Sequence, residues 1–356
     1  MRPLDRSLLP TPRSDRCSDQ VLDPGRRLGS NDEMGFEDRR ALYQRVRAGP
    51  MFRDWHWLQY NLTIHNGHET SFAVRTLDAL VSCDQVMPGY ADRMILRLES
   101  LGGHEKSQDD YEAIRQWLGE LLVVNHLVTC DWPVDVSFRD EPKSPGNKKR
   151  PELLVVGREW SLGVEVKTPD LRKFRSERFK NDVQVLARLP LEVVPESEHK
   201  TLPRDNPMKD FLRSASEKFQ GFRSSNAEFR GILFVIWDDY VKEPLSALLS
   251  PHSGLFTPRS FATDEDGSPS SFSEVDAVVL IRHQHQLTEG MAGRPPLDER
   301  RDFLDYGEVG RFPPNLLVLN PRGNDLSEPI LTALQALPPS HFLGAEGIPG
   351  EIIFWI

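Results

Sequence analysis

Residues 148–170 read KKRPELLVVGREWSLGVEVKTPD, and this stretch decides how the middle of the chain is interpreted. Apolar residues alternate with others across residues 161–168, so the pattern predicts a strand with Glu165 and Lys167 on one face and valine and leucine on the other. A second apolar run, residues 153–156, comes before this strand and is followed by a turn that contains Gly157. The two runs predict an antiparallel strand pair, which brings Glu152 close to Glu165 or Lys167.

The composition indicates a globular protein. A chain of 356 residues with 38% hydrophobic residues is long and apolar enough to bury a core. It contains no apolar run of about 18 residues, and its first residues mix charge with proline, so we expect no membrane partner and a cytoplasmic location. The cysteines, Cys17, Cys83 and Cys130, lie far apart, which favours neither a disulfide framework nor a zinc site.

Charge is distributed unevenly along the chain. The formal net charge of −10 argues against a protein that coats nucleic acid nonspecifically. Between Lys167 and Arg230, however, the sequence contains 14 Lys and Arg residues but only 10 Asp and Glu residues. The densest basic segment follows directly after the strand pair and contains Arg172, Lys173, Arg175, Arg178 and Lys180.

The pattern divides the chain into four parts. Residues 1–34 are polar and rich in proline, which predicts a disordered arm. Residues 35–105 form an N-terminal subdomain that is mostly helical, residues 106–330 an α/β core, and residues 331–356 a C-terminal helix and strand that pack on the core. Within the subdomain two interpretations stay open. Alternation over residues 60–64 before Asn66-Gly67 favours a β-hairpin, whereas the spacing in residues 71–83 favours a helix.

The core pattern indicates a mixed central sheet flanked by helices. Apolar spacing predicts a helix of about five turns over residues 109–128, with Asp109 or Asp110 as its N-cap. Strands follow in DWPVDVSFRDEP, RPELLVV and SLGVEVKT, then a helix in MKDFLRSASEKFQGF and a strand in RGILFVIW that both faces should cover. Further strands are expected in VDAVVLIR, NLLVLN and EIIFWI.

The charged face of the second strand points to metal chemistry. Two carboxylates a few ångströms apart repel, and each raises the pKa of the other unless a cation lies between them. Oxygen ligands of this kind suit Mg²⁺ or Mn²⁺. A lysine beside such an ion can help deprotonate a water and can contact a phosphate, where negative charge develops during hydrolysis.

These residues resemble the PD-(D/E)XK nuclease superfamily, which has the restriction endonuclease-like fold. Pro151-Glu152, twelve residues and then Glu165-Val166-Lys167 match its motif, and helix, three strands, helices and strand is similar to its αβββαβ core. The resemblance covers roughly residues 106–240. The chain departs from the pattern at Glu152, where the family usually has aspartate; the extra methylene moves the carboxylate by about 1.5 Å.

The resemblance implies a metal-dependent nuclease that hydrolyses phosphodiester bonds, with DNA the expected substrate, by a water that the metal activates. Glu152 and Glu165 would hold the metal, Lys167 would serve the water and the phosphate, and Glu120 on the first helix would assist, since Glu112 points away from the apolar stripe. Lys218 or Gln220 on the following helix would face the site, and the basic segment would track phosphates. Roles in restriction, repair or defence are compatible with this resemblance.

Two other functions fit the same pattern. The chain could be a scaffold or protein-binding module with an inactive site, marked by Glu152, or an enzyme that acts on a small phosphorylated compound. A homodimer or a protein partner is compatible with each. Convergence of Glu152, Glu165 and Lys167 favours the nuclease, whereas a Lys167 that pairs outward in solvent favours the scaffold. His283, His285 and Asp238, at strand ends, are interpreted as structural or surface residues.

Overall fold

The computed structural model is of the α/β class, and a mixed sheet of seven strands lies at its centre. It describes residues 30–54, 56–63, 71–103, 107–143, 148–171, 176, 180–181, 183–185, 200–201, 206–238, 242–339 and 352–354. The first 29 residues of the predicted arm, the Asn66-Gly67 turn and most of the basic segment lie outside these ranges.

The helices of the described residues are α1 (Ser30–Ala48), α2 (Pro50–Arg53), α3 (Gln59–Thr63), α4 (Phe72–Val86), α5 (Tyr90–Ser100), α6 (Gln108–Thr129), α8 (Asn206–Ser225), α9 (Lys242–Leu249), α10 (Gln284–Met291) and α11 (Glu328–Leu334). The strands are β1 (Ser137–Asp140), β2 (Leu153–Val156), β3 (Ser161–Lys167), β4 (Val183–Val185), β5 (Lys200–Thr201), β6 (Phe229–Trp237), β7 (Ala277–Arg282), β8 (Asn315–Leu319), β9 (Ala336–Leu337) and β10 (Ile352–Phe354).

The N-terminal part of the described chain is helical from α1 to α5. Residues 59–63 form α3 and residues 72–86 form α4, so the structure supports the helical interpretation here, and the expected strand at residues 60–63 is wrong. Ser71 caps α4 by accepting a hydrogen bond from the backbone N–H of Val74 at 3.3 Å. Helix α1 begins at Ser30, before the expected start of order near residue 35.

The central sheet has the order β1-β2-β3-β6-β7-β8-β9. Strands β1, β2 and β3 pair antiparallel, β6 pairs parallel to β3, β7 parallel to β6, and β8 antiparallel to β7. The predicted hairpin of β2 and β3 is confirmed, with a turn closed by a hydrogen bond of 3.0 Å from Gly157 N–H to the Trp160 carbonyl. The mixed sheet with helices on both faces confirms the α/β class.

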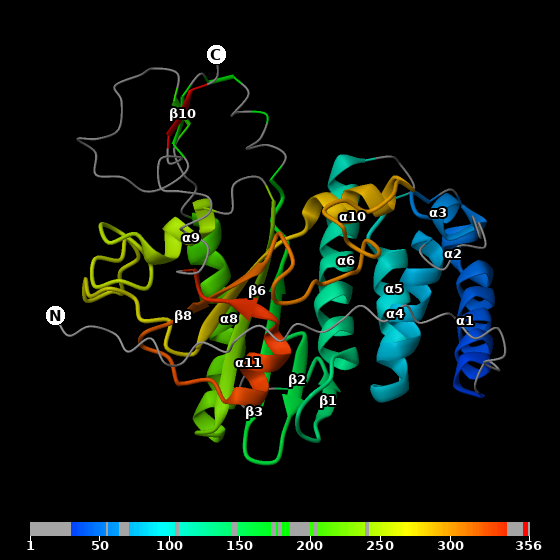
Figure 1. The fold of residues 1–356 in the computed structure, drawn as a ribbon, viewed down its shortest axis with the longest axis horizontal. Helices are drawn as coiled ribbons and strands as arrows, with labels where there is room; N and C mark the ends of the chain where they lie inside the picture. The colour runs from blue at the N-terminus through cyan, green and yellow to red at the C-terminus, as the bar shows by residue number, and fades with distance from the viewer. Residues whose placement is uncertain are drawn as a thin grey trace, which may run out of the picture.

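Two apolar layers sandwich the sheet. One layer joins α4, α5 and α6 to side chains such as Val164 and Phe234, and the other joins α8 and α9 to side chains such as Phe229 and Leu233. Figure 1 shows the sheet between α8 on one side and α6 on the other, with α5, α4 and α1 beyond α6. Strand β6 is buried almost throughout, because helices cover both of its faces as its continuous apolar run predicted.

Helix α6 carries one of the predicted acids and packs closely on β3. Its N-cap is Ser107, whose hydroxyl accepts from the backbone N–H groups of Asp109 and Asp110, so the expected aspartate cap is wrong. The two aspartates lie in the first turn instead, where the helix dipole favours negative charge. Gly119 permits the close approach: a Cβ there would collide with the Thr168 hydroxyl and would lie 2.9 Å from Ile236 Cδ1.

The C-terminal strands belong to two different sheets. Strand β9 pairs parallel to β8 at the edge of the central sheet. Strand β10, in the apolar EIIFWI segment, pairs antiparallel with β4 in a separate sheet of order β10-β4-β5. Strand β10 therefore does not extend the central sheet, because β4 supplies its hydrogen-bonding edge. Among the described helices, none is long and apolar enough to cross a lipid bilayer.

Candidate functional site

The β2–β3 hairpin places Glu152 opposite Glu165. Leu153 pairs with Val164, and the Glu152 N–H donates a hydrogen bond of 2.9 Å to the Val164 carbonyl. Pro151 lies before the first residue of β2, where a proline is tolerated because it interrupts no strand. The period of two then puts Glu152 on the same face as Leu154, which contacts the layer under α8.

Lysines from β3 and α8 bind the two carboxylates. The Lys167 ammonium lies 2.7 Å from Glu165 Oε1. The Lys218 ammonium bridges both acids, at 2.7 Å from Glu165 Oε1 and 3.2 Å from Glu152 Oε1. The structure therefore brings Glu152, Glu165, Lys167 and Lys218 together, and Lys167 pairs inward with Glu165, not outward with solvent groups.

Burial sets the electrostatics of this group. The Glu165 side chain is 0% exposed, because Phe219 of α8 covers the same face of β3 beside Gly163. Burial, and then the neighbouring charge of Glu152, raise the pKa of Glu165, while Lys167 and Lys218 act in the opposite sense. Burial alone would lower the pKa of Lys218, but the charges of Glu152 and Glu165 outweigh it and raise that pKa. The two acids thus favour the charged form of Lys218, whereas the lysines only partly offset the upward shift of the Glu165 pKa.

Glu120 reaches the same group from α6. Its side chain is buried, and its Oε2 accepts a hydrogen bond of 2.5 Å from Arg97 on α5. Arg93, one turn earlier, lies 3.8 Å from Glu120 Oε1 and also binds Asp140 and Glu141 at the end of β1. Helix α5 is thereby tied to α6 and to β1 through two guanidinium groups.

The protonation of Glu120 depends on its neighbours. Burial, and next the charge of Glu152, raise the pKa of Glu120 to about 7, while Arg97 and Arg93 lower it. The carboxyl group of Glu120 is therefore half ionised near neutral pH. After burial, the charge of Glu152 has the largest effect on this pKa, so the acids of α6 and β2 influence each other electrostatically.

The donor atoms of this site suit a hard divalent ion. Among the buried carboxylate oxygens of the described residues, Glu165 Oε2 and Glu120 Oε1 have no hydrogen-bond partner, whereas Glu165 Oε1 is held by its ion pairs with Lys167 and Lys218. Such oxygens are the ligands that Mg²⁺ and Mn²⁺ prefer. As the described side chains stand, however, no group of three or more His, Cys, Asp or Glu residues is arranged to hold a metal ion. Lys218 occupies the position between Glu152 and Glu165.

Solvent reaches the site from the side of the basic groups. The side chains of Arg97 and Lys167 are 35% and 25% exposed, whereas the carboxylates of Glu120 and Glu165 lie beneath them. A phosphate could therefore contact the cations first.

The other predicted site residues are placed as follows. Gln220 is exposed, since two residues along a helix turn the side chain by about 200° away from Lys218. Lys180 is exposed and lies in a turn, while the remaining members of the basic segment, Arg172, Lys173, Arg175 and Arg178, lie outside the described residues. Glu112, which was expected to point away from the apolar stripe of the helix, is buried and pairs with Arg115 at 2.7 Å, because α6 is also covered by α10.

Sequence reasoning missed the arginines of α5 at the site. The only signal available was the spacing of Arg93 and Arg97, which share one side of a helix at i and i+4. A second group outside the predicted set joins His285 of α10 to Asp238 at 2.8 Å and to Asp298 at 2.6 Å. These bonds connect the ends of strands with the loop after α10, in agreement with the structural interpretation of His285.

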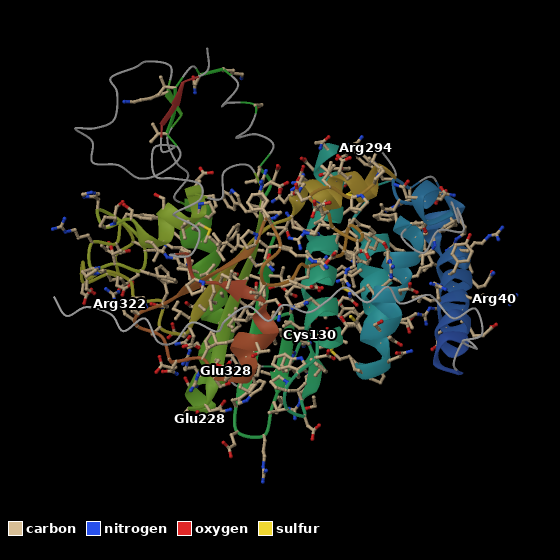
Figure 2. The ribbon with its side chains drawn as sticks, in the orientation of Figure 1. Arg40, Cys130, Glu228, Arg294, Arg322 and Glu328 are labelled. Atoms are coloured by element: carbon tan, nitrogen blue, oxygen red, sulfur yellow. The ribbon has the colours of Figure 1, made fainter. Side chains whose placement is uncertain are left out.

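A cavity of about 870 Å³ lies apart from these residues. It is lined by α4, the C-terminal half of α6, residues 301–309 and the end of α11, and it includes Cys130, which Figure 2 labels. None of the predicted site residues lines it. His126 and Tyr306 stack in its wall with ring centroids 3.7 Å apart.

Comparison with protein-family models, with curated proteins and with solved structures finds no match to this chain. Its function is therefore inferred from the geometry of its own residues.

Proposed function

We propose that the chain is a metal-dependent nuclease that hydrolyses phosphodiester bonds, with DNA as the expected substrate. One observation carries this proposal: Glu152, Glu165 and Lys167 converge with Lys218. The charge of Glu152 also acts on the buried Glu120 of α6. The element order supports it: α6, β1, β2 and β3 are followed, after the short strands β4 and β5, by α8 and β6, which is similar to the αβββαβ order that the sequence resemblance implies.

Glu152 and Glu165 would hold a Mg²⁺ or Mn²⁺ ion, with Glu120 as the third acid. When bound, such an ion neutralises charge on the phosphate and lowers the pKa of a water. Hydrolysis forms a bond from the water oxygen to phosphorus and breaks the bond from phosphorus to the ester oxygen. The water loses a proton in this step, and the departing ester oxygen gains one.

The remaining groups of the site match these needs. Glu120, held by Arg97 on α5, would complete the set of acids around the ion. Lys167 would orient the attacking water, which would release its proton to solvent. Lys167 is held by Glu165 yet partly exposed, so its ammonium contacts a phosphate oxygen while its position stays fixed. Lys218 and Arg97 supply further positive charge for the negative charge that develops.

A panel of labelled substrates tests the proposal. Wild type and Lys167→Ala are incubated with single-stranded DNA, duplex DNA, RNA and a small phosphate ester, each with Mg²⁺, with Mn²⁺ and with EDTA. We expect metal-dependent cleavage of DNA by wild type and its loss in Lys167→Ala. Lys149→Ala is the matched control, because Lys149 forms an exposed ion pair with Glu217 on α8.

Other results of the substrate panel would favour one of the alternative functions. Cleavage of the small ester alone would replace the nuclease by an enzyme of phosphorylated metabolites. A folded wild type that cleaves no substrate with either metal would contradict the proposal and favour the scaffold.

A further inference from the structure

The ion pairs of the candidate site occupy carboxylate oxygens that a metal ion would also use. Lys218 lies between Glu152 and Glu165, where each of its contacts occupies a carboxylate oxygen. Arg97 occupies Glu120 in the same way, at 2.5 Å from Oε2. Both cations come from helices that flank the sheet on opposite faces, α8 and α5, so two independent elements place positive charge on the acids.

A cation from solution would compete with these side chains. A divalent ion on Glu152 and Glu165 would meet the Lys218 ammonium at hydrogen-bonding distance from the same oxygens, and like charges repel at such separations. Arg97 likewise neutralises part of the charge that Glu120 would offer to an ion. The site as it stands therefore offsets part of the charge of its acids internally, at the expense of affinity for a metal.

The phosphate groups of a nucleic acid are alternative partners for Lys218 and Arg97. Arg97 is partly exposed, and guanidinium groups bind phosphate oxygens through paired hydrogen bonds. Lys218 is less exposed, with 16% of its side chain accessible, yet its flexible stem allows the ammonium to move. A phosphate at the site would thus draw positive charge away from the acids.

We propose that Lys218 and Arg97 act as internal counter-ions, which keep metal affinity low until a nucleic-acid phosphate draws them from Glu152, Glu165 and Glu120. This inference rests on the proposed function and names how the same site is regulated. Divalent ion and nucleic acid then bind cooperatively. Since coupling between two ligands is reciprocal, each raises the affinity for the other by the same factor.

Binding of Mn²⁺ alone, measured by the paramagnetic resonance of the free ion, tests this inference without any catalytic readout. We expect Lys218→Gln and Arg97→Gln to bind Mn²⁺ roughly 5- to 100-fold more tightly than wild type in the absence of DNA, the range typical of coupled sites. Arg97→Lys keeps the charge and should retain the wild-type affinity. Circular dichroism confirms that each variant is folded.

Two matched controls lie outside the site. Arg294→Gln removes an exposed arginine–glutamate pair with Glu289 beside α10, where Figure 2 shows Arg294 at the surface. Lys149→Gln removes the lysine–glutamate pair with Glu217 on α8. Neither should change the affinity for Mn²⁺.

The second arm adds a short duplex with phosphorothioate linkages that resists cleavage. For wild type, we expect the duplex to tighten Mn²⁺ binding and Mn²⁺ to tighten duplex binding, measured by fluorescence anisotropy, by equal factors. In Lys218→Gln and Arg97→Gln, the factor by which Mn²⁺ and the duplex tighten each other's binding should be smaller than in wild type. Variants that bind Mn²⁺ no better than wild type, or a wild type indifferent to the duplex, would overturn the inference while DNA cleavage still upheld the nuclease. A wild type that neither binds Mn²⁺ nor cuts DNA would overturn both.

Discussion

Glu120 should make the stability of the protein depend on pH. Burial, opposed only in part by Arg97 and Arg93, raises its pKa from 4.5 to about 7. At about 1.4 kcal/mol per pKa unit, this difference corresponds to roughly 3 kcal/mol. Because the folded state binds the proton more tightly than the unfolded state, this contribution to the free energy of unfolding is fully present below about pH 4.5 and is lost as the pH rises through about 7.

The variant Glu120→Gln removes this dependence, because glutamine keeps the shape of the protonated carboxyl group. We expect the free energy of unfolding of the variant, relative to wild type, to increase by about 2 to 3 kcal/mol between about pH 5 and about pH 8. Urea unfolding followed by circular dichroism at both pH values measures the difference. The exposed Glu265 supplies the control: Glu265→Gln should show no such change with pH.

A difference between Glu120→Gln and wild type that stays constant from about pH 5 to about pH 8 would refute the reasoning. It would mean that the arginines of α5 hold the carboxylate ionised throughout this range. A wild type that gains stability over the variant as the pH rises would contradict it more strongly.

Three further predictions follow from the packing and charge of the chain. Gly119→Ala should cost about 1 to 3 kcal/mol in urea unfolding, since the added methyl group collides with Thr168 where α6 approaches β3. Gln284→Leu should cost about 2 to 4 kcal/mol in the same measurement, because it leaves the partners of three buried hydrogen bonds unsatisfied. The double variant Lys173→Ala, Arg175→Ala should weaken DNA binding and reduce the slope of log affinity against log salt by about 1.8. Its affinity for Mn²⁺ should be unchanged. An unchanged slope would mean that neither residue contacts a DNA phosphate.

The strand pair of the site was predictable because local periodicity determines it. The period of two in β3 fixes Glu165 and Lys167 on one face, and the short turn at Gly157 fixes the register that brings Glu152 opposite Glu165. The apolar run of β6 indicates burial on both faces for the same reason. Each of these inferences needs only residues that are close in sequence.

The rest of the site depends on contacts between distant segments. Arg93 and Arg97 belong to an amphipathic helix, and no local pattern shows that its charged side faces α6 instead of water. Residues 60–63 were ambiguous because alternation over a few residues is compatible with a strand and with one turn of helix. The partner of β10 could not be predicted, since pairing between strands so far apart leaves no local signal.

We propose that Glu165, with its neighbours, holds the metal needed to cut phosphodiester bonds, and a cleavage assay examines this role of Glu165. Single-turnover cleavage of duplex DNA is followed across a Mn²⁺ titration for wild type, Glu165→Gln and the exposed control Glu265→Gln, all verified as folded. We predict that Glu165→Gln lowers the cleavage rate by about a hundredfold or more at every Mn²⁺ concentration, while the control cuts like wild type. Cleavage by Glu165→Gln at the wild-type rate would contradict the claim and place the chemistry elsewhere in the molecule.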